Sequence, residues 1–180
     1  NPLLIIPEEQ ILYALANIQA GGSERRGQRP PLNLCLVIDR STSMQGSRLD
    51  QVKAATYQLI ESLSPDDTLG VVTFSDHAEA VWPNQPAGEV TRAKSKVAAI
   101  QAGGGTEILQ GMLTGLAELD KRRRLQAVNH MILLTDGQTY GDEEMCLAQA
   151  VDAKKRGVTI MCMGLGDDWN DALLDAIATR

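Results

Sequence analysis

The sequence lacks the features that mark a membrane, nucleic-acid-binding or secreted protein. No apolar run approaches the roughly 18 residues of a membrane-spanning helix. The chain opens without a basic stretch followed by an apolar one, so no secretion signal is visible, although it does not begin with Met. A formal net charge of −6 argues against general nucleic-acid binding, which uses a basic face. The 180 residues and 43% hydrophobic content suit one soluble globular domain.

Cysteine is scarce and does not form a pattern. Cys35, Cys146 and Cys162 are odd in number and make neither a CxxC pair nor a zinc-ligand spacing. We interpret them as small hydrophobic residues in a reducing compartment. This favours a cytoplasmic location, with a secreted or surface-attached parent chain as the alternative.

The common catalytic motifs are also absent. The "GGGT" segment at 103–106 lacks the GK[ST] ending of a phosphate-binding loop, and there is no G-x-S-x-G nucleophile turn. Only two histidines are present. His130 begins the apolar run that ends before Asp136, which places it about 20 Å away in an extended strand. We therefore expect that the protein is not an enzyme.

Apolar runs alternate with amphipathic segments along most of the chain. This alternation predicts an α/β domain with a doubly wound, mainly parallel sheet, because strands buried on both faces are continuously apolar. The first segment differs: 9–20 is interpreted as a strand and 21–31 as an exposed linker, so that 1–31 precedes the main domain at 32–180. The expected strands are 32–39, 67–75, 78–83, 128–136 and 158–166, and the expected helices are 47–63, 90–102, 107–123, 142–157 and 169–180.

Polar side chains follow the expected strands where a ligand would bind. In open α/β sheets, ligands lie beyond the carboxyl ends of the strands, at the point where the strand order reverses. Asp39, Ser41 and Ser43 follow the first strand, Asp136 follows the strand at 128–136, and Thr106 precedes a helix. In the simplest strand order the first strand and the 128–136 strand are neighbours, so these five side chains converge.

Two carboxylates and three hydroxyls make an all-oxygen set. Such a set suits hard cations, so Mg²⁺ is the expected metal, with Mn²⁺ or Ca²⁺ as alternatives. With only two carboxylates, the ion would accept a further anionic oxygen, for example from an Asp or Glu of a partner protein. Taken singly, Ser43 and Thr106 also fit helix caps and Asp136 fits a turn; their combination favours a metal site.

The segments "DRSTSM" (39–44), "GGGT" (103–106) and "LLTDG" (133–137) resemble the metal-ion-dependent adhesion site of von Willebrand factor type A (vWA) domains. The resemblance covers about 32–180, and "GVVTFSD" and "GLGDDWND" are most similar to its bacterial, intracellular-type branch. It implies a Rossmann-like sheet with helices on both faces and one short antiparallel edge strand at 78–83. Such domains usually end with a further strand, whereas this chain ends at Arg180, which is compatible with a domain trimmed before that strand.

The resemblance also implies how the site works. Ser41, Ser43 and Thr106 would bind the metal directly, and Asp39 and Asp136 would often act through waters. The family's usual role is protein–protein binding through an acidic residue of the partner, with no nucleic acid involved. The residues that flank these ligands are the expected partner-binding rim: Arg40, Thr42, Gln138, Thr139 and Tyr140.

Two alternatives remain at this stage. A phosphatase of the haloacid dehalogenase type would use Asp39, "ILLT" at 132–135, Lys154 or Lys155, and "GDDWND" at 166–171. That mechanism needs a second aspartate two residues after the first as general acid, and Ser41 stands there. The other alternative is a structural domain whose site holds no metal.

Overall fold

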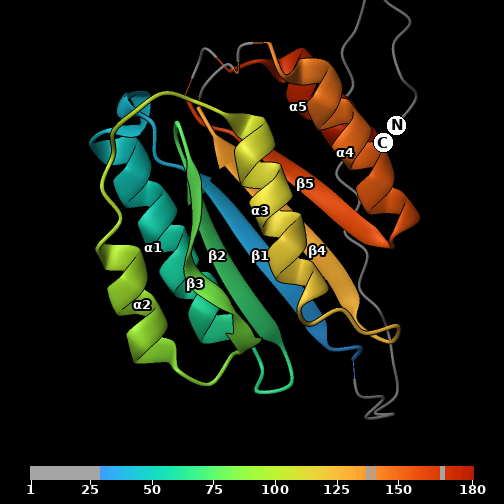
Figure 1. Ribbon diagram of the computed structural model, residues 1–180. Helices are drawn as coiled ribbons and strands as arrows, with labels where there is room; N and C mark the ends of the chain where they lie inside the picture. Colours follow the sequence, from blue (N-terminus) through green and yellow to red (C-terminus); the bar gives the residue numbers. More distant parts are fainter. Residues whose placement is uncertain (1–28, 137–138, 140, 167–168) are drawn as a thin grey trace, which may run out of the picture.

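A five-stranded sheet forms the centre of the molecule in the computed structural model, which describes residues 29–136, 139, 141–166 and 169–180 (Figure 1). The strand order is β3-β2-β1-β4-β5, and all neighbours are parallel except the β2–β3 pair. The predicted fold class is confirmed, while the strand predicted at 9–20 lies outside the described residues. The strands are β1 (Leu32–Asp39), β2 (Thr68–Phe74), β3 (Ala78–Pro86), β4 (Val128–Thr135) and β5 (Val158–Gly164).

Strand β1 lies in the middle of the sheet and is buried along nearly its whole length. Its neighbours are β2 and β4, as the simplest strand order predicts. Ile38 pairs with Leu134, so β1 and β4 end level with each other. The chain order of the two strands therefore delivers Asp39 and Asp136 to one edge of the sheet.

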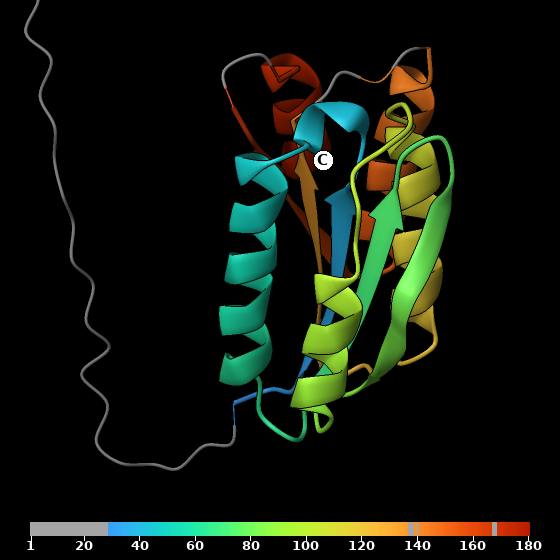
Figure 2. The same ribbon diagram turned by 90° about the vertical axis from the view of Figure 1, so that its left-hand side faces the viewer.

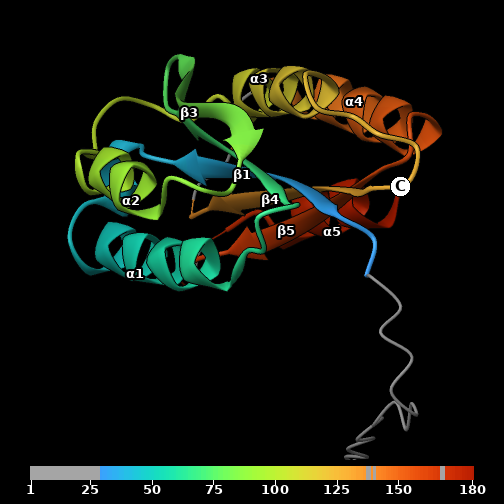
Figure 3. The same ribbon diagram turned by 90° about the horizontal axis from the view of Figure 1, so that it is seen from below.

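Helices cover both faces of the sheet (Figure 3). Helices α1 (Ser47–Ser62) and α2 (Val90–Ala98) cover one face, and α3 (Ile108–Asp120) and α4 (Glu143–Lys155) cover the other. Helix α5 (Asp171–Thr179) packs against α4 and β5. Each face has its own buried apolar cluster, as expected for a sheet between two helical layers.

Gly115 lets helix α3 approach the sheet closely. A Cβ at that position would come within 2.5 Å of a methyl carbon of Val37 and 2.9 Å of the Met131 terminal methyl carbon. A larger residue would require Val37, Met131 or the helix itself to shift. Gly115 thus allows α3, which begins two residues after Thr106, to pack closely on β1 and β4.

The edge strand β3 is longer than predicted. We expected Pro83 to end it, but the strand continues to Pro86. Among the strands that the structure describes, β3 pairs only with β2, and an edge strand of this kind is where sheets tolerate a residue without an amide such as Pro83. The pairing with β2 also shifts register between Leu69 and Val71, opposite this stretch, as a bulge does.

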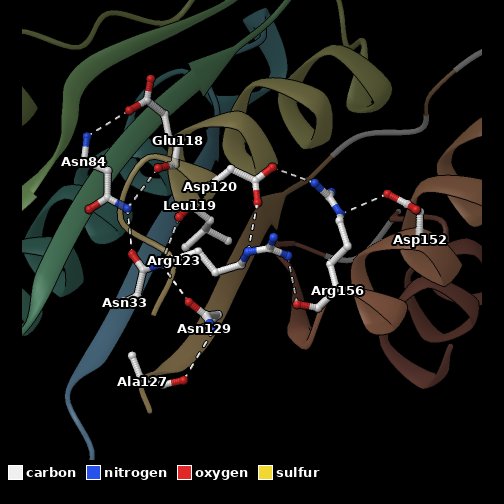
Figure 4. Close-up of polar contacts among 10 residues, drawn as sticks. All are labelled: Asn33, Asn84, Glu118, Leu119, Asp120, Arg123, Ala127, Asn129, Asp152 and Arg156. Carbon is white, nitrogen blue, oxygen red and sulfur yellow. Dashed lines mark hydrogen bonds and ion pairs between the residues drawn. The ribbon is translucent and has the colours of Figure 1, made fainter. Parts of the chain in front are cut away.

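At the end of the sheet opposite the carboxyl edge, buried amide side chains join three strands to α3 (Figure 4). The Asn33 amide donates to the Asn129 side chain at 2.8 Å and to the Leu119 carbonyl at 3.0 Å. The Asn84 amide donates to the Asn33 side chain at 2.7 Å, and the Glu118 carboxylate accepts from the Asn84 backbone at 2.9 Å. These bonds tie β1, β3 and β4 to the C-terminal end of α3.

The cysteines behave as the sequence predicts. Cys35 and Cys146 are buried, Cys162 is half-buried, and all three are free thiols. Burial raises the pKa of Cys146 and Cys162 to about 12 and that of Cys35 further. Within the part of the chain that the structure describes, no helix is long and apolar enough to cross a membrane.

Asp67 anchors the start of both β1 and β2. Its buried carboxylate accepts from the Leu32 amide at 2.8 Å, the Ser64 amide at 2.7 Å and the Arg29 guanidinium at 2.5 Å. Burial alone would raise the pKa of Asp67, but these amides and the guanidinium outweigh it and lower that pKa below its usual value. The ionised form of Asp67 is therefore the one that stabilises the fold.

We expect Asp67→Asn to lower the free energy of unfolding by about 1–3 kcal/mol at pH 7, because two partly buried amides lose a charged acceptor. The lowered pKa means that this stabilisation is present above the unfolded-state value of about 3.9 and disappears as the pH falls through the folded-state value. Urea denaturation across pH checks this. The exposed neighbour Asp66→Asn is the control, and a wild-type advantage that does not shrink below about pH 4 would contradict the assignment.

Candidate metal-binding site

The carboxylate of Asp39 is fully buried at the end of β1. One of its oxygens accepts from the Ser41 amide at 2.7 Å, and the other accepts from the Thr135 hydroxyl at 2.5 Å. Burial raises the pKa of Asp39, the charge of Asp136 adds to this effect, and the bonds from Thr135 and Ser41 oppose it. A carboxylate in this position favours a cation close by.

A chain of oxygen contacts leads from the first loop to the second. Ser41 Oγ lies 3.0 Å from Ser43 Oγ, and the Ser43 hydroxyl donates to Asp136 Oδ1 at 2.7 Å. Ser41 directly precedes a short 3₁₀ helix, η1 (Thr42–Met44), which contains Ser43 and which the sequence did not predict. This turn directs both serine hydroxyls toward the loop after β4.

The "GGGT" loop is fastened to the first loop by backbone hydrogen bonds. The Gly103 amide donates to the Arg40 carbonyl at 2.7 Å, and the Thr42 amide and hydroxyl both donate to the Gly104 carbonyl at 3.0 Å. Gly104 has a φ of +89°, a backbone conformation that strongly favours glycine. The segments after β1 and α2 thus meet at the end of the sheet where β4 also finishes (Figure 2).

Of the five predicted ligands, Asp39, Ser41, Ser43 and Asp136 are therefore connected by direct contacts. Thr106 lies in the fastened loop, and its carbonyl accepts from the Thr139 hydroxyl at 3.5 Å. The described residues contain no group of three or more His, Cys, Asp or Glu that could hold a metal. A cation here would depend on hydroxyl oxygens as well as carboxylates, which suits a hard ion and not a thiolate-seeking one.

Sequence reasoning missed Asp142, which joins two parts of the site. The sequence places it only at the start of the expected helix 142–157, whereas its carboxylate accepts from the Leu109 amide at 3.0 Å and from the Thr139 hydroxyl. It thereby holds the loop after β4 against the first turn of α3. An acidic residue before a helix does not distinguish its own helix from a neighbouring one, so the sequence contained no signal for this role.

Arg48 on α1 is a second residue that the sequence did not single out. Its guanidinium donates to Asp136 Oδ2 at 2.5 Å and to the Ser43 carbonyl at 3.2 Å. A positive charge therefore contacts one of the two carboxylates of the site. Any metal ion bound beside Asp136 would meet the repulsion of this guanidinium.

The structure corrects the predicted partner-binding rim at Thr139. Thr139 is only 3% exposed, and its hydroxyl bonds with Asp142 inside the protein, so it is not available to a partner. Thr42 is exposed, although its hydroxyl donates to Gly104. Arg40 is half-buried and its guanidinium donates to the Gly103 carbonyl at 3.5 Å. Gln138 and Tyr140 lie outside the described residues.

The lysines of the phosphatase alternative lie far from Asp39. Lys154 and Lys155 are in the last turn of α4, and Lys155 lines a hollow with Asn129 at the start of β4. Asp39 is at the opposite end of the neighbouring strand. With Ser41 in place of a general acid, this geometry disfavours phosphatase chemistry.

Known proteins resemble this chain over most of its length. Residues 33–180 match the sequence model of the von Willebrand factor type A domain. An uncharacterized protein of Synechocystis sp. is 38% identical over 160 residues, 88% of this chain and 38% of that protein. Human inter-alpha-trypsin inhibitor heavy chain H4 is 33% identical over 159 residues, 82% of this chain and 17% of that protein. The chain thus spans well under two thirds of these relatives.

Solved structures share the fold. A von Willebrand factor type A protein from Catenulispora acidiphila has a TM-score of 0.71 at 26% identity, covering 82% of this chain and 36% of that chain. Mussel proximal thread matrix protein 1 with a zinc-occupied adhesion-site motif has a TM-score of 0.68 at 22% identity, covering 83% of this chain and 41% of that chain. Manganese-loaded TRAP protein of Plasmodium vivax has a TM-score of 0.69 at 24% identity, covering 84% of this chain and 63% of that chain.

We expect Asp142→Ala to lower the free energy of unfolding by about 1–3 kcal/mol, because the partly buried Leu109 amide and the Thr139 hydroxyl lose their acceptor. Asp142→Asn, which keeps one acceptor oxygen, should cost less. Asp152→Ala on the exposed side of the same helix is the control and should cost at most about 1 kcal/mol. Urea denaturation measures all three, and equal effects of Asp142→Ala and Asp152→Ala would contradict the predicted role.

Proposed function

The chain belongs to the von Willebrand factor type A family, and on this basis we propose that residues 32–180 form a metal-dependent protein-binding module. The observation that most supports this proposal is the continuous chain of oxygens from Ser41 through Ser43 to Asp136, with the buried Asp39 behind it. The two metal-loaded relatives of the same fold support a divalent ion. The all-oxygen set favours Mg²⁺, with Mn²⁺ or Ca²⁺ as substitutes.

In this proposal Ser41, Ser43 and Thr106 bind the ion directly, while Asp39 and Asp136 hold its waters and balance its charge. The bound ion supplies an electrophilic position that a carboxylate of an Asp or Glu from the partner protein occupies. Such a contact removes a carboxylate from water onto a divalent charge, which makes it a candidate hot spot of the interface. The module itself would have no catalytic activity, and its three free thiols suit a reducing compartment such as the cytoplasm.

Calorimetry with Mg²⁺ and Mn²⁺ tests the site directly. We expect saturable binding of one ion by the wild-type protein and a loss of at least about 100-fold in affinity in Ser41→Ala/Ser43→Ala, because both hydroxyl ligands disappear together. Ser62→Ala at the end of α1 should bind as the wild type does. Absence of metal binding by the wild-type protein would overturn the proposal.

A substitution at Arg48 gives a second test, in which the metal affinity is expected to rise instead of fall. Arg48→Ala removes a positive charge from Asp136, so the same calorimetry should show affinity for Mg²⁺ up to about fivefold tighter. Arg122→Ala at the opposite end of the sheet changes the net charge equally and should leave the affinity unchanged. A weaker affinity in Arg48→Ala would instead mean that Arg48 positions Asp136 for the metal.

A further inference from the structure

A pocket of about 530 Å³ lies beside the candidate metal site, on the face of the sheet that α1 and α2 cover. It is bordered by β3, by the C-terminal end of α2 and by Arg40, which stands between Asp39 and Ser41. Figure 2 shows the chain after α2 rising along β2 and β3 toward the loops of the metal site. The polar residues of its lining are Arg40, Thr73, Glu79, Lys96 and Gln101.

Two buried hydrogen-bonding atoms of this lining are unpartnered. Thr73 is fully buried, and neither its hydroxyl nor Nε of Arg40 bonds to any described residue. Buried polar groups in proteins are nearly always paired, so two such atoms at one pocket require a water or a ligand that bonds to them there. Both can donate a hydrogen bond, and a ligand that satisfies both must offer acceptor oxygens.

The charged residues of the pocket indicate which acceptor group a ligand would carry. Arg40 and Lys96 form no ion pair with any described residue, whereas Arg48 and Arg92 each have a carboxylate partner. With Glu79 also in the lining, the pocket has a net charge of about +1. A carboxylate carries one negative charge and two acceptor oxygens, and it matches this pocket better than a doubly charged phosphate.

The surroundings favour a side chain of a bound protein segment over a free small anion. The pocket continues along β3 into a second hollow of about 380 Å³, which shares Lys96 and reaches Trp82 and Arg92. Arg40 stands between Asp39 and Ser41 in the chain, so this pocket borders the metal site. A segment lying in this groove would therefore reach both places at once.

We propose that this pocket binds a second acidic side chain of the same partner whose first carboxylate reaches the metal. This inference rests on the proposed function for the identity of the partner, but the pocket itself binds a carboxylate without any metal. The partner would then present two acidic residues, separated by the distance between the metal site and the pocket. Arg40 and Thr73 would be specificity-determining residues.

The first experiment titrates sodium acetate into metal-free, ¹⁵N-labelled protein at constant ionic strength and follows the amide of Thr73 and the Arg40 Nε–H by NMR. We expect saturable shifts whose midpoint rises at least about fivefold in Thr73→Val and in Arg40→Gln. Thr73→Val should keep or raise the thermal midpoint, because the hydroxyl that it removes has no described partner. Arg122→Gln is the charge-matched control and should leave the acetate midpoint unchanged.

Ser41→Ala/Ser43→Ala separates this inference from the proposed function. We expect that variant to lose Mg²⁺ binding and to keep the acetate response. The proposal that the pocket binds a carboxylate would be overturned if the wild-type protein showed no saturable response to acetate. It would also be overturned if Thr73→Val and Arg40→Gln left that response unchanged. A tighter response to inorganic phosphate than to acetate would overturn its assignment to a carboxylate.

The second experiment compares synthetic peptides with Mg²⁺ present. One peptide has a single Asp, and the others add a Glu after glycine spacers of increasing length. We expect one spacing to bind at least about tenfold tighter than the single-Asp peptide, and this gain should disappear in Thr73→Val. If acetate saturates the pocket but no spacing gives a gain, the pocket takes a free small carboxylate and its assignment to the partner is wrong.

Discussion

The site depends on the burial of one carboxylate. Asp39 ends a strand that is apolar along nearly its whole length, and its side chain is shielded completely from water. An ionised carboxylate in such a place is strongly unfavourable unless donors or cations surround it. The Ser41 amide and the Thr135 hydroxyl supply two donors, one from its own loop and one from the neighbouring strand. The same need for compensation makes the position attractive to a divalent ion.

Around this carboxylate, three loops hold one another in place by short-range bonds. The Gly103–Gly104 backbone bonds to Arg40 and Thr42, and Asp142 ties the loop after β4 to the start of α3. Gly115 also lets α3 pack closely on β1. A binding site whose parts are held in advance loses less conformational entropy when its ligand arrives.

Much of this arrangement could be predicted from the sequence. The continuous apolar runs gave the strands within a residue or two at most ends, and the order of alternation placed β1 beside β4. Asp39, Ser41, Ser43 and Asp136 then had to meet, because the carboxyl ends of parallel neighbours share an edge. The extension of β3 past Pro83 was not predictable, since the effect of a proline depends on whether its side of the strand has a partner.

Contacts between distant side chains were the part that sequence reasoning could not reach. Arg48 and Thr73 sit among ordinary helix and strand residues, and only the packing shows that one contacts Asp136 and the other lines a pocket. Thr139 was expected at the partner-binding rim because it follows a predicted ligand in the chain. Its hydroxyl instead donates to Asp142 inside the protein. Long charged and hydroxyl side chains have too many possible partners for spacing alone to choose between them.

The buried amides at the far end of the sheet have a consequence for folding fidelity. Side chains on a strand alternate between faces, so a slip of one residue between β1 and β4 would turn Asp39 away from Asp136. Apolar runs alone discriminate weakly against such a slip, because a strand buried on both faces is apolar in either register. Asn33 lies opposite Asn129 in the native register, and the bond between their side chains would be lost in a slipped one. The buried amides at this end of the sheet therefore favour the alignment that brings Asp39 and Asp136 together at the other end.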